Sequence, residues 1–237
     1  MSGIVLITGI TGGFGRALGA EFRRRGFRVI GSARRAPESA DFADEFIAAD
    51  LSNPDGVRGL AAEVRARHGK LDVLVNNAGI GCFGPHEELP IDALQRMMRL
   101  NLEVPVLLCR LLLRSLKASG GQIINISSVT ATKEAPHGCA YAATKAGLSH
   151  FSESLFAEVR KSGVNVTVIE PDMTRSDFYE PLNFTCAEGE EYALLPQDVA
   201  DAVVYAVTSP GYANVSRVTL QPQKNRIARK EPRAPSL

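Results

Sequence analysis

The amino-acid sequence predicts an α/β protein with a doubly wound parallel sheet of seven strands and helices on both faces. Short β-branched apolar runs alternate along the 237-residue chain with segments of helical periodicity, which is the order of elements in parallel sheets. The runs are apolar throughout, as strands buried on both faces are. A chain of this length, 45% hydrophobic and without an internal repeat, is expected to form a single domain.

Seven apolar runs give the expected strands, and the amphipathic segments between them give the helices. The strands are expected at residues 3–9, 27–33, 46–51, 71–77, 121–128, 164–171 and 215–222. The helices are expected at residues 13–25, 54–68 and 91–117, in the segment that contains Tyr141, and from Gln197 onward. Residues 1–222 would then form a single-domain Rossmann fold, whose ligands bind beyond the carboxyl ends of the strands. Residues 223–237 carry five basic side chains, and we expect them to be a frayed, solvated tail.

The overall composition excludes several classes of protein. The formal net charge of +1 gives no general attraction to nucleic acid or to a membrane surface. The four cysteines show no paired spacing and the four histidines no metal-ligand spacing, so we expect reduced thiols and no metal site. No charged and apolar leader precedes the first strand, and no apolar run reaches the roughly 18 residues of a membrane span. We therefore expect a soluble protein of the cytoplasm.

A glycine-rich turn follows the first expected strand directly and opens the next helix. It reads TGITGGFG over residues 8–15. Glycines allow a tight turn and a close approach of the backbone to a pyrophosphate, which the amides and the dipole of the helix N-terminus attract. Glycine also serves ordinary turns, but the place of this turn between the first strand and the first helix favours a nucleotide site.

Five motifs of the chain resemble, in order and spacing, those of the classical short-chain dehydrogenases/reductases. The turn fits the pattern TGxxxGxG, and NNAG stands at residues 76–79, after the fourth strand. Asn101 lies in the next helix, and Ser128 ends the fifth strand within NISS. The pattern YxxxK places Tyr141 and Lys145 one turn apart on one face of a helix.

This resemblance, which runs from about residue 3 to residue 220, implies catalysis of hydride transfer between a nicotinamide coenzyme and a substrate. Tyr141 would be the general acid/base, and Ser128 would hydrogen-bond the substrate oxygen. A phenol has a pKa of about 10, which a nearby positive charge lowers by roughly 1–3 units. Lys145 would supply that charge and would also hold the hydroxyls of the nicotinamide ribose.

Asn101 would bind a water molecule in a proton relay, by the same resemblance. Pro105 lies four residues later and has no N–H, so the carbonyl of Asn101 lacks its usual helical donor. A packing kink in a long helix would free the same carbonyl without using it, and this alternative stays open.

The resemblance also implies which residues hold the coenzyme. They lie in the glycine-rich turn, at the ends of the following strands and in the segment after the sixth strand. They are Gly9, Thr11, Gly12, Gly13, Phe14, Gly15, Ser32, Arg34, Asp50, Leu51, Asn77, Ala78, Gly79, Tyr141, Lys145, Pro171, Thr174 and Ser176. Asp50 would accept from the adenine amine, although an aspartate after a strand is also a common helix cap.

The end of the second strand, VIGSARR, predicts a preference for NADP(H) over NAD(H). Ala33 stands where NAD-using relatives place an aspartate for the ribose hydroxyls, so no carboxylate repels a 2′-phosphate there. Arg34 follows, and its planar guanidinium suits bidentate phosphate contact. Gly12 occupies the other basic position of NADP-using relatives, so Arg34 would carry most of the discrimination alone.

Residues 176–195 are expected to form a mobile lid over the substrate, because they follow the nicotinamide end of the sixth strand. Their acidic and aromatic side chains favour an uncharged, partly apolar substrate, a secondary alcohol or ketone. Arg175 keeps open a rival substrate, a small hydroxy acid of the 3-hydroxy acid or serine type.

Two departures from the family pattern affect these expectations. The family's Pro-Gly after the sixth strand is Pro171-Asp172 here, and glycine is what allows the backbone to approach the nicotinamide closely. The last strand lacks the frequent Val-Asp-Gly-Gly ending, which favours a homodimer through the long fourth and fifth helices over the family's homotetramer.

Two other functions remain open at this stage. One is a non-catalytic NADP-binding regulatory protein or scaffold, against which the intact set of Asn101, Ser128, Tyr141 and Lys145 argues. The other is a sugar-nucleotide epimerase or dehydratase, which shares YxxxK. Those relatives usually carry a longer C-terminal substrate domain, whereas this chain ends soon after the seventh expected strand.

Overall fold

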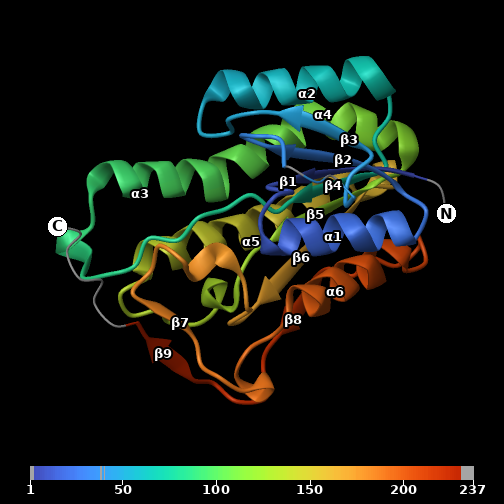
Figure 1. Ribbon diagram of the computed structural model, residues 1–237. Helices are drawn as coiled ribbons and strands as arrows, with labels where there is room; N and C mark the ends of the chain where they lie inside the picture. Colours follow the sequence, from blue (N-terminus) through green and yellow to red (C-terminus); the bar gives the residue numbers. More distant parts are fainter. Residues whose placement is uncertain (1–2, 38, 40, 231–237) are drawn as a thin grey trace.

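The computed structural model describes residues 3–37, 39 and 41–230, which form a parallel sheet between two layers of helices (Figure 1). The sheet has seven strands in the order β3-β2-β1-β4-β5-β6-β8, and every neighbouring pair is parallel. The strands are β1 (Ile4–Thr8), β2 (Arg28–Ala33), β3 (Glu45–Ala48), β4 (Val73–Asn76), β5 (Gln122–Ile126), β6 (Asn165–Pro171) and β8 (Arg217–Leu220). The order reverses between β1 and β4, so the predicted doubly wound fold is confirmed.

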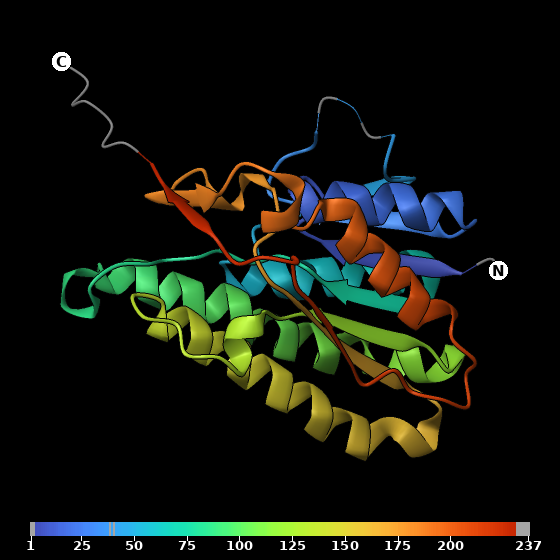
Figure 2. The ribbon, with the colours of Figure 1, turned by 90° about the horizontal axis from the view of Figure 1, so that it is seen from below.

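Helices cover both faces of this sheet, with α1 and α6 on one face and α2, α4 and α5 on the other (Figures 1 and 2). The α-helices are α1 (Gly13–Arg24), α2 (Pro54–His68), α3 (Ile91–Met98), α4 (Val104–Ser119), α5 (Cys139–Val159) and α6 (Pro196–Thr208). Short 3-10 helices are η1 (His86–Glu88), η3 (Val129–Ala131), η4 (Arg160–Ser162), η5 (Asp177–Tyr179) and η6 (Glu190–Tyr192). Within the described residues, no helix is both long and apolar enough to cross a bilayer.

The sheet separates two hydrophobic cores, because successive side chains of a strand point to opposite faces. Leu6 of β1 packs in the core beneath α2, α4 and α5. Its neighbours Val5 and Ile7 pack in the core beneath α1 and α6. All three side chains are fully buried, which is why the strands had to be apolar at every position.

The helix predicted over residues 91–117 contains a π-helical turn, η2, at Arg99–Glu103. Helices α3 and α4 flank this turn without a break, and the N–H of Val104 donates to the carbonyl of Arg99, five residues back. Pro105 explains the wider turn, because in an α-helix its ring would clash with the carbonyl four residues earlier. Asn101 lies in the middle of the turn and is buried.

The tail expected over residues 223–237 is not frayed throughout its described part, although most of the described side chains are exposed as expected. Ile227–Arg229 form strand β9, which pairs antiparallel with strand β7 (Phe184–Cys186) of the predicted lid. Figure 2 shows the two strands side by side at the edge of the molecule. An isolated strand leaves its backbone groups unpaired, and β9 supplies partners for those of β7. Residues 231–237 lie outside the described part.

Candidate active site

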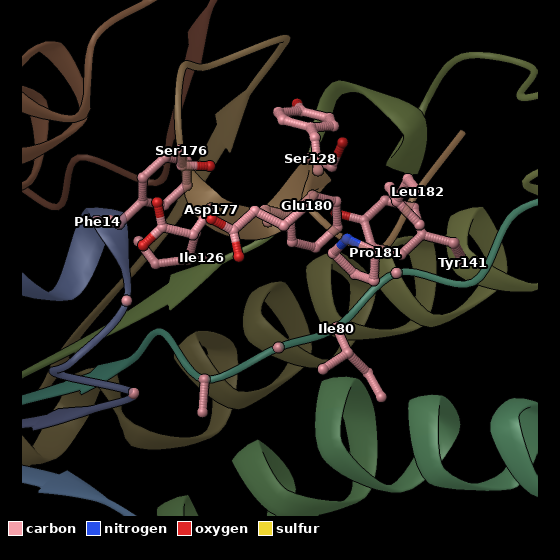
Figure 3. A pocket seen from close by; sticks show the side chains of 18 of the residues that line it. Phe14, Ile80, Ile126, Ser128, Tyr141, Ser176, Asp177, Glu180, Pro181 and Leu182 are labelled. Atoms are coloured by element: carbon pink, nitrogen blue, oxygen red, sulfur yellow. The ribbon is translucent and has the colours of Figure 1, made fainter. Parts of the chain in front are cut away.

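A cleft of about 2710 Å³ opens at the carboxyl ends of the sheet strands. It extends from the end of β2, past the turn after β1 and the ends of β4 and β5, to the lid that follows β6. Figure 3 looks into this cleft, with the lid residues Asp177, Glu180 and Pro181 on one side and Ile80 on the other. The position agrees with the rule that such sheets bind ligands at the switch point.

The glycine-rich turn after β1 is packed so closely that a side chain is excluded at three positions. Gly9 has a φ of +67°, and a Cβ there would lie 2.9 Å from the backbone of the NNAG segment. A Cβ on Gly15 would lie 2.2 Å from the carbonyl oxygen of Gly9, and one on Gly13 would lie 2.8 Å from the Cβ of Ser176. Gly12 differs, because the nearest atom to its Cβ would be 3.6 Å away.

The N-terminus of α1 presents backbone donors to the cleft. Its N-cap, Gly12, forms no side-chain cap, and the first turn has no acidic residue. First-turn N–H groups have no partner within their helix and carry the positive end of the helix dipole. Gly12, Gly13 and Phe14 all line the cleft, so a pyrophosphate group fits this surface.

Asn77 fastens the segment after β4 to the turn after β1. Its Nδ2 donates to the carbonyls of Thr8 and Gly9, at 2.9 and 3.2 Å. The hydroxyl of Thr8 accepts from the N–H groups of Asn77 and Ala78, at 3.0 and 3.1 Å. Asn77, Ala78 and Gly79 line the cleft, so the NNAG motif has a structural task beside its predicted coenzyme contact.

Arg34 and Asp50 line the end of the cleft beside β2 and β3, together with Ala33 and Leu51. Asp50 Oδ1 accepts from the hydroxyl and the N–H of Ser52, at 2.7 and 3.0 Å. These two hydrogen bonds, with a smaller contribution from the charge of Arg34, hold the pKa of Asp50 below its usual value. Asp50 therefore stays an ionised acceptor, as a contact with an adenine amine requires.

Three residues of the predicted coenzyme set do not line the cleft, and the others do. Ser32 and Thr174 are fully buried, and Gly15 lies beneath the turn. Ser32 acts through its carbonyl, which accepts from the N–H of Gly9 at 2.8 Å. The hydroxyl of Thr174 donates to the carbonyl of Asp172 at 2.9 Å. These residues shape the backbone around the cleft and present no side chain to it.

Tyr141 and Lys145 reach the cleft from one face of α5, and Ser128 reaches it from the end of β5. Lys145 Nζ donates to the carbonyl of Ile126 at 2.8 Å and lies 5.6 Å from the centre of the Tyr141 ring. Ser128 is close enough to Tyr141 for a hydrogen bond that lowers the phenol pKa. The fold thus brings three of the four predicted catalytic residues to one place in the cleft.

Burial dominates the pKa values of the two titratable groups. It raises the pKa of Tyr141 to about 12, against the smaller opposing effect of Ser128, and it lowers the pKa of Lys145 to about 8. The predicted lowering of the Tyr141 pKa is not found in this structure, because desolvation of the phenolate outweighs the effects that lower it. At neutral pH, Tyr141 keeps its proton and most of Lys145 is charged.

The fourth residue, Asn101, stands behind the wall of the cleft. Its side chain accepts from the N–H of Ile80 and donates to the carbonyl of Ile80, both at 2.9 Å. Its Nδ2 also donates to the hydroxyl of Thr144 in α5, at 3.2 Å. Asn101 therefore fixes Ile80, which lines the cleft, to the helix of Tyr141 and Lys145. The proton relay through its backbone carbonyl stays a prediction.

Asp172, in the place of the family glycine, lines the cleft and is held by three neighbours. Its Oδ1 accepts from the N–H of Met173 at 2.8 Å, and its Oδ2 accepts from the amide of Gln221 at 3.3 Å. The ammonium of Lys133 lies 3.9 Å from the same Oδ2. The carboxylate is thus partnered by the loop after β5 and by the end of β8.

Aromatic side chains form the wall of the cleft beside Tyr141. The ring centre of Phe83 lies 5.1 Å from that of Tyr141, and the ring centre of Phe178 lies 5.9 Å from it. Phe184 packs on Phe83 at 5.2 Å and on Tyr179 at 5.7 Å. The lid aromatics were visible in the sequence, but Phe83 belongs to no motif, and only the fold places it here.

These features agree with a family comparison. A profile described as short chain dehydrogenase matches residues 3–186, which is most of the chain. The chain belongs to the short-chain dehydrogenase/reductase family, whose members are oxidoreductases that use a nicotinamide coenzyme and act on CH–OH groups.

Three known proteins show how similar the chain is to members of this family. It is 31% identical to a serine 3-dehydrogenase from Rhizobium radiobacter, over 96% of this chain and 97% of that one. It is 30% identical to an NADP-dependent 3-hydroxy acid dehydrogenase from Escherichia coli, over 92% and 94%. A metagenomic short-chain oxidoreductase, solved in complex with NADP, superimposes with a TM-score of 0.79 at 30% identity, over 93% and 96%.

Proposed function

We propose that this protein is an NADP-dependent oxidoreductase that interconverts a secondary alcohol and its ketone. The observation that carries the proposal is the meeting of Tyr141, Lys145 and Ser128 in a cleft whose other end has a phosphate-binding turn. When bound, the coenzyme would supply a hydride, and with it two electrons, for the carbonyl carbon of the ketone. Tyr141 would give its proton to the carbonyl oxygen.

Each of the three side chains has a separate task in this reaction. Tyr141 holds the proton that the carbonyl oxygen needs, since its pKa of about 12 keeps the phenol neutral at physiological pH. Ser128 donates to the same oxygen and orients it. The charge of Lys145 stabilises the phenolate that remains when the proton leaves, and its pKa of about 8 makes this charge sensitive to mild alkali.

A preference for NADP(H) is supported by the end of β2 and by the relatives. Arg34 is exposed in the wall of the cleft, next to Ala33, where no carboxylate opposes a 2′-phosphate. One relative is named NADP-dependent, and one solved neighbour holds NADP.

The variant Tyr141→Phe tests the proposed reaction, because it removes the hydroxyl and keeps the ring that packs on Phe83. We expect ketone reduction with NADPH to fall at least about 100-fold. Fluorescence titration with NADPH is expected to show unchanged binding. Tyr205→Phe is the matched control, since Tyr205 is 65% exposed on α6, outside the cleft. Turnover of Tyr141→Phe near that of the control would contradict the proposal.

The rival function is the oxidation of a small hydroxy acid, which the names of two relatives favour. Its carboxylate was expected to meet Arg175. The guanidinium of Arg175 instead donates to the carbonyls of Ala187 and Gly189, at 3.2 and 2.6 Å, and does not line the cleft. Oxidation of L-serine and 3-hydroxybutyrate, measured beside reduction of uncharged ketones with both coenzymes, decides between the two functions.

We also propose that the protein acts in the cytoplasm as a homodimer through the long helices α4 and α5, or as a homotetramer. Size-exclusion chromatography with light scattering gives the number of subunits. A monomer at micromolar concentration would contradict this part of the proposal.

A further inference from the structure

The substrate end of the cleft carries more aromatic surface than proton transfer requires. Phe83, Phe178 and Phe184 are half-buried and line the cleft. Phe184 stands at 90° to Phe83, and Phe178 stands at 80° to it with the ring centres 6.5 Å apart. Perpendicular rings offer both faces and edges, which is the arrangement that another aromatic ring packs against most favourably.

Two glycines allow these rings to lie against the backbone. A Cβ on Gly81 would lie 2.4 Å from Phe83 Cε2 and 2.7 Å from Phe178 Cζ. A Cβ on Gly138 would lie 2.9 Å from Phe83 Cδ1. Neither glycine has a positive φ, so no turn geometry requires glycine there. The missing Cβ atoms instead make room for the two rings.

The charged groups around these rings disfavour an anionic substrate. Asp177 and Glu180 of the lid line the cleft and are exposed (Figure 3). Lys133 is paired with Asp172, and Arg175 is turned to the lid backbone. A carboxylate near the lid would therefore meet two negative side chains, and these two cations are already engaged.

We propose that Phe83, Phe178 and Phe184 form an aromatic box that binds a flat apolar substituent on the carbonyl carbon. The preferred substrates are then aryl ketones and the corresponding benzylic secondary alcohols. Phe83 and Phe178 both pack on Tyr141, so a ring held in the box lies next to the oxygen that Tyr141 protonates. The inference rests on the proposed ketone reduction and adds the class of substrate.

One rival contact for an oxo acid remains in the structure. Arg229 of β9 is opposite Phe184 in the strand register, lines the cleft and is exposed. Side chains at directly opposite positions lie on the same face of a strand pair. An ion pair between Arg229 and a carboxylate substrate is the rival contact, and Arg229→Ala tests it.

The test compares acetophenone, 2-butanone and 3-oxobutanoate as substrates with NADPH. We expect kcat/KM for acetophenone to exceed the values for 2-butanone and 3-oxobutanoate at least about tenfold.

Phe178→Ala is expected to lower kcat/KM for acetophenone about tenfold through a higher KM, with a smaller loss for 2-butanone. Gly81→Ala should also lower the ratio of kcat/KM for acetophenone over 2-butanone, because the added methyl group pushes the rings into the box. Phe156→Ala is the matched control, since it removes a half-buried ring of α5 outside the cleft and should leave the ratio unchanged.

Two results with these variants would overturn the box. One is a preference for 3-oxobutanoate that Arg229→Ala abolishes. The other is a ratio of kcat/KM for acetophenone over 2-butanone that is the same in Phe178→Ala and Phe156→Ala.

Binding to the box can also be measured without turnover. Saturation-transfer NMR detects acetophenone on the NADP-bound Tyr141→Phe variant, with and without Phe178→Ala. Binding that needs Phe178 while the wild type reduces no ketone would support the box and refute the proposed function. Reduction of ketones without a preference for acetophenone would refute the box and support the proposed function.

Discussion

The coenzyme half and the substrate half of the cleft are built in different ways. The coenzyme half consists of turns that follow β1, β2 and β4 directly. Their backbone is packed so closely that a Cβ added to Gly15 would lie only 2.2 Å from the Gly9 carbonyl oxygen. The substrate half consists of side chains from the loop of Phe83, from the lid and from β9. Backbone packing therefore sets the first half, and side-chain packing sets the second.

This difference separates what is general in the protein from what is specific. A pyrophosphate binds to backbone N–H groups at a fixed spacing, and a short glycine motif supplies these groups. A substrate binds to a cleft wall of matching shape, and loops on a rigid scaffold can change that wall without disturbing the sheet. Variants in the two halves are expected to separate coenzyme binding from substrate selection.

The largest effect is expected for Lys145→Ala, at the junction of the two halves. Both turnover and coenzyme binding should suffer, with turnover falling about 10³-fold, because one buried ammonium serves Tyr141 and the ribose. In the wild type, reduction should decline as the pH rises through about 8, where Lys145 loses its proton. Steady-state kinetics and NADPH titration measure both effects. Lys161→Ala, in the exposed η4, is the control, and a Lys145→Ala enzyme within tenfold of it would refute the assignment.

The next effect is expected in the coenzyme half alone. Arg34→Ala should lower the ratio of kcat/KM for NADP(H) over NAD(H) about ten- to a hundredfold, the value of one charge-assisted contact. Gly12→Arg should raise the ratio, because the nearest atom to a Cβ there is 3.6 Å away. Arg35→Ala is the matched control and should change the ratio less. A wild type that favours NAD(H), or an unchanged ratio in Arg34→Ala, would contradict a contact between Arg34 and the 2′-phosphate.

A smaller effect is expected in the substrate half when the chain is ended after Gln223. Strand β7 then loses β9, and the carbonyls of Tyr179 and Glu180 lose the ammonium of Lys230. The ketone KM should rise up to about tenfold, since the lid must now be ordered on binding. The affinity for NADPH should stay the same. Lys230→Ala keeps β9 and should give a fraction of the effect. A loss of NADPH affinity as large as the rise in ketone KM would show that the two halves of the cleft are not independent.

The smallest effect is expected for Pro105→Ala, behind the cleft. The restored N–H can bond the carbonyl of Asn101 and convert the π turn of Arg99–Glu103 to α-helix. Turnover should fall about two- to fivefold with a shifted pH–rate profile and little change in thermal stability. Calorimetry and pH-dependent kinetics are the measurements. If the rate and the profile are unchanged, Pro105 only shapes the packing of the helix.

The sequence alone determined the parts of this protein in which neighbouring residues along the chain act together. Apolar runs with no alternation required a sheet buried on both faces, and Leu6 and Ile7 do face different cores. The glycine turn needs only the strand before it and the helix after it. Tyr141 and Lys145 share a helix face because helical geometry puts them there.

Only the tertiary structure decided the features that depend on contacts between distant segments. Phe83 meets Phe184 across a hundred residues of chain, and Ile227–Arg229 pair with strand β7 of the lid. The pKa of Tyr141 rises to about 12 because burial removes water from the phenol, a quantity that no spacing of residues contains. Local geometry is encoded within a few residues, whereas burial and long-range packing are properties of the whole fold.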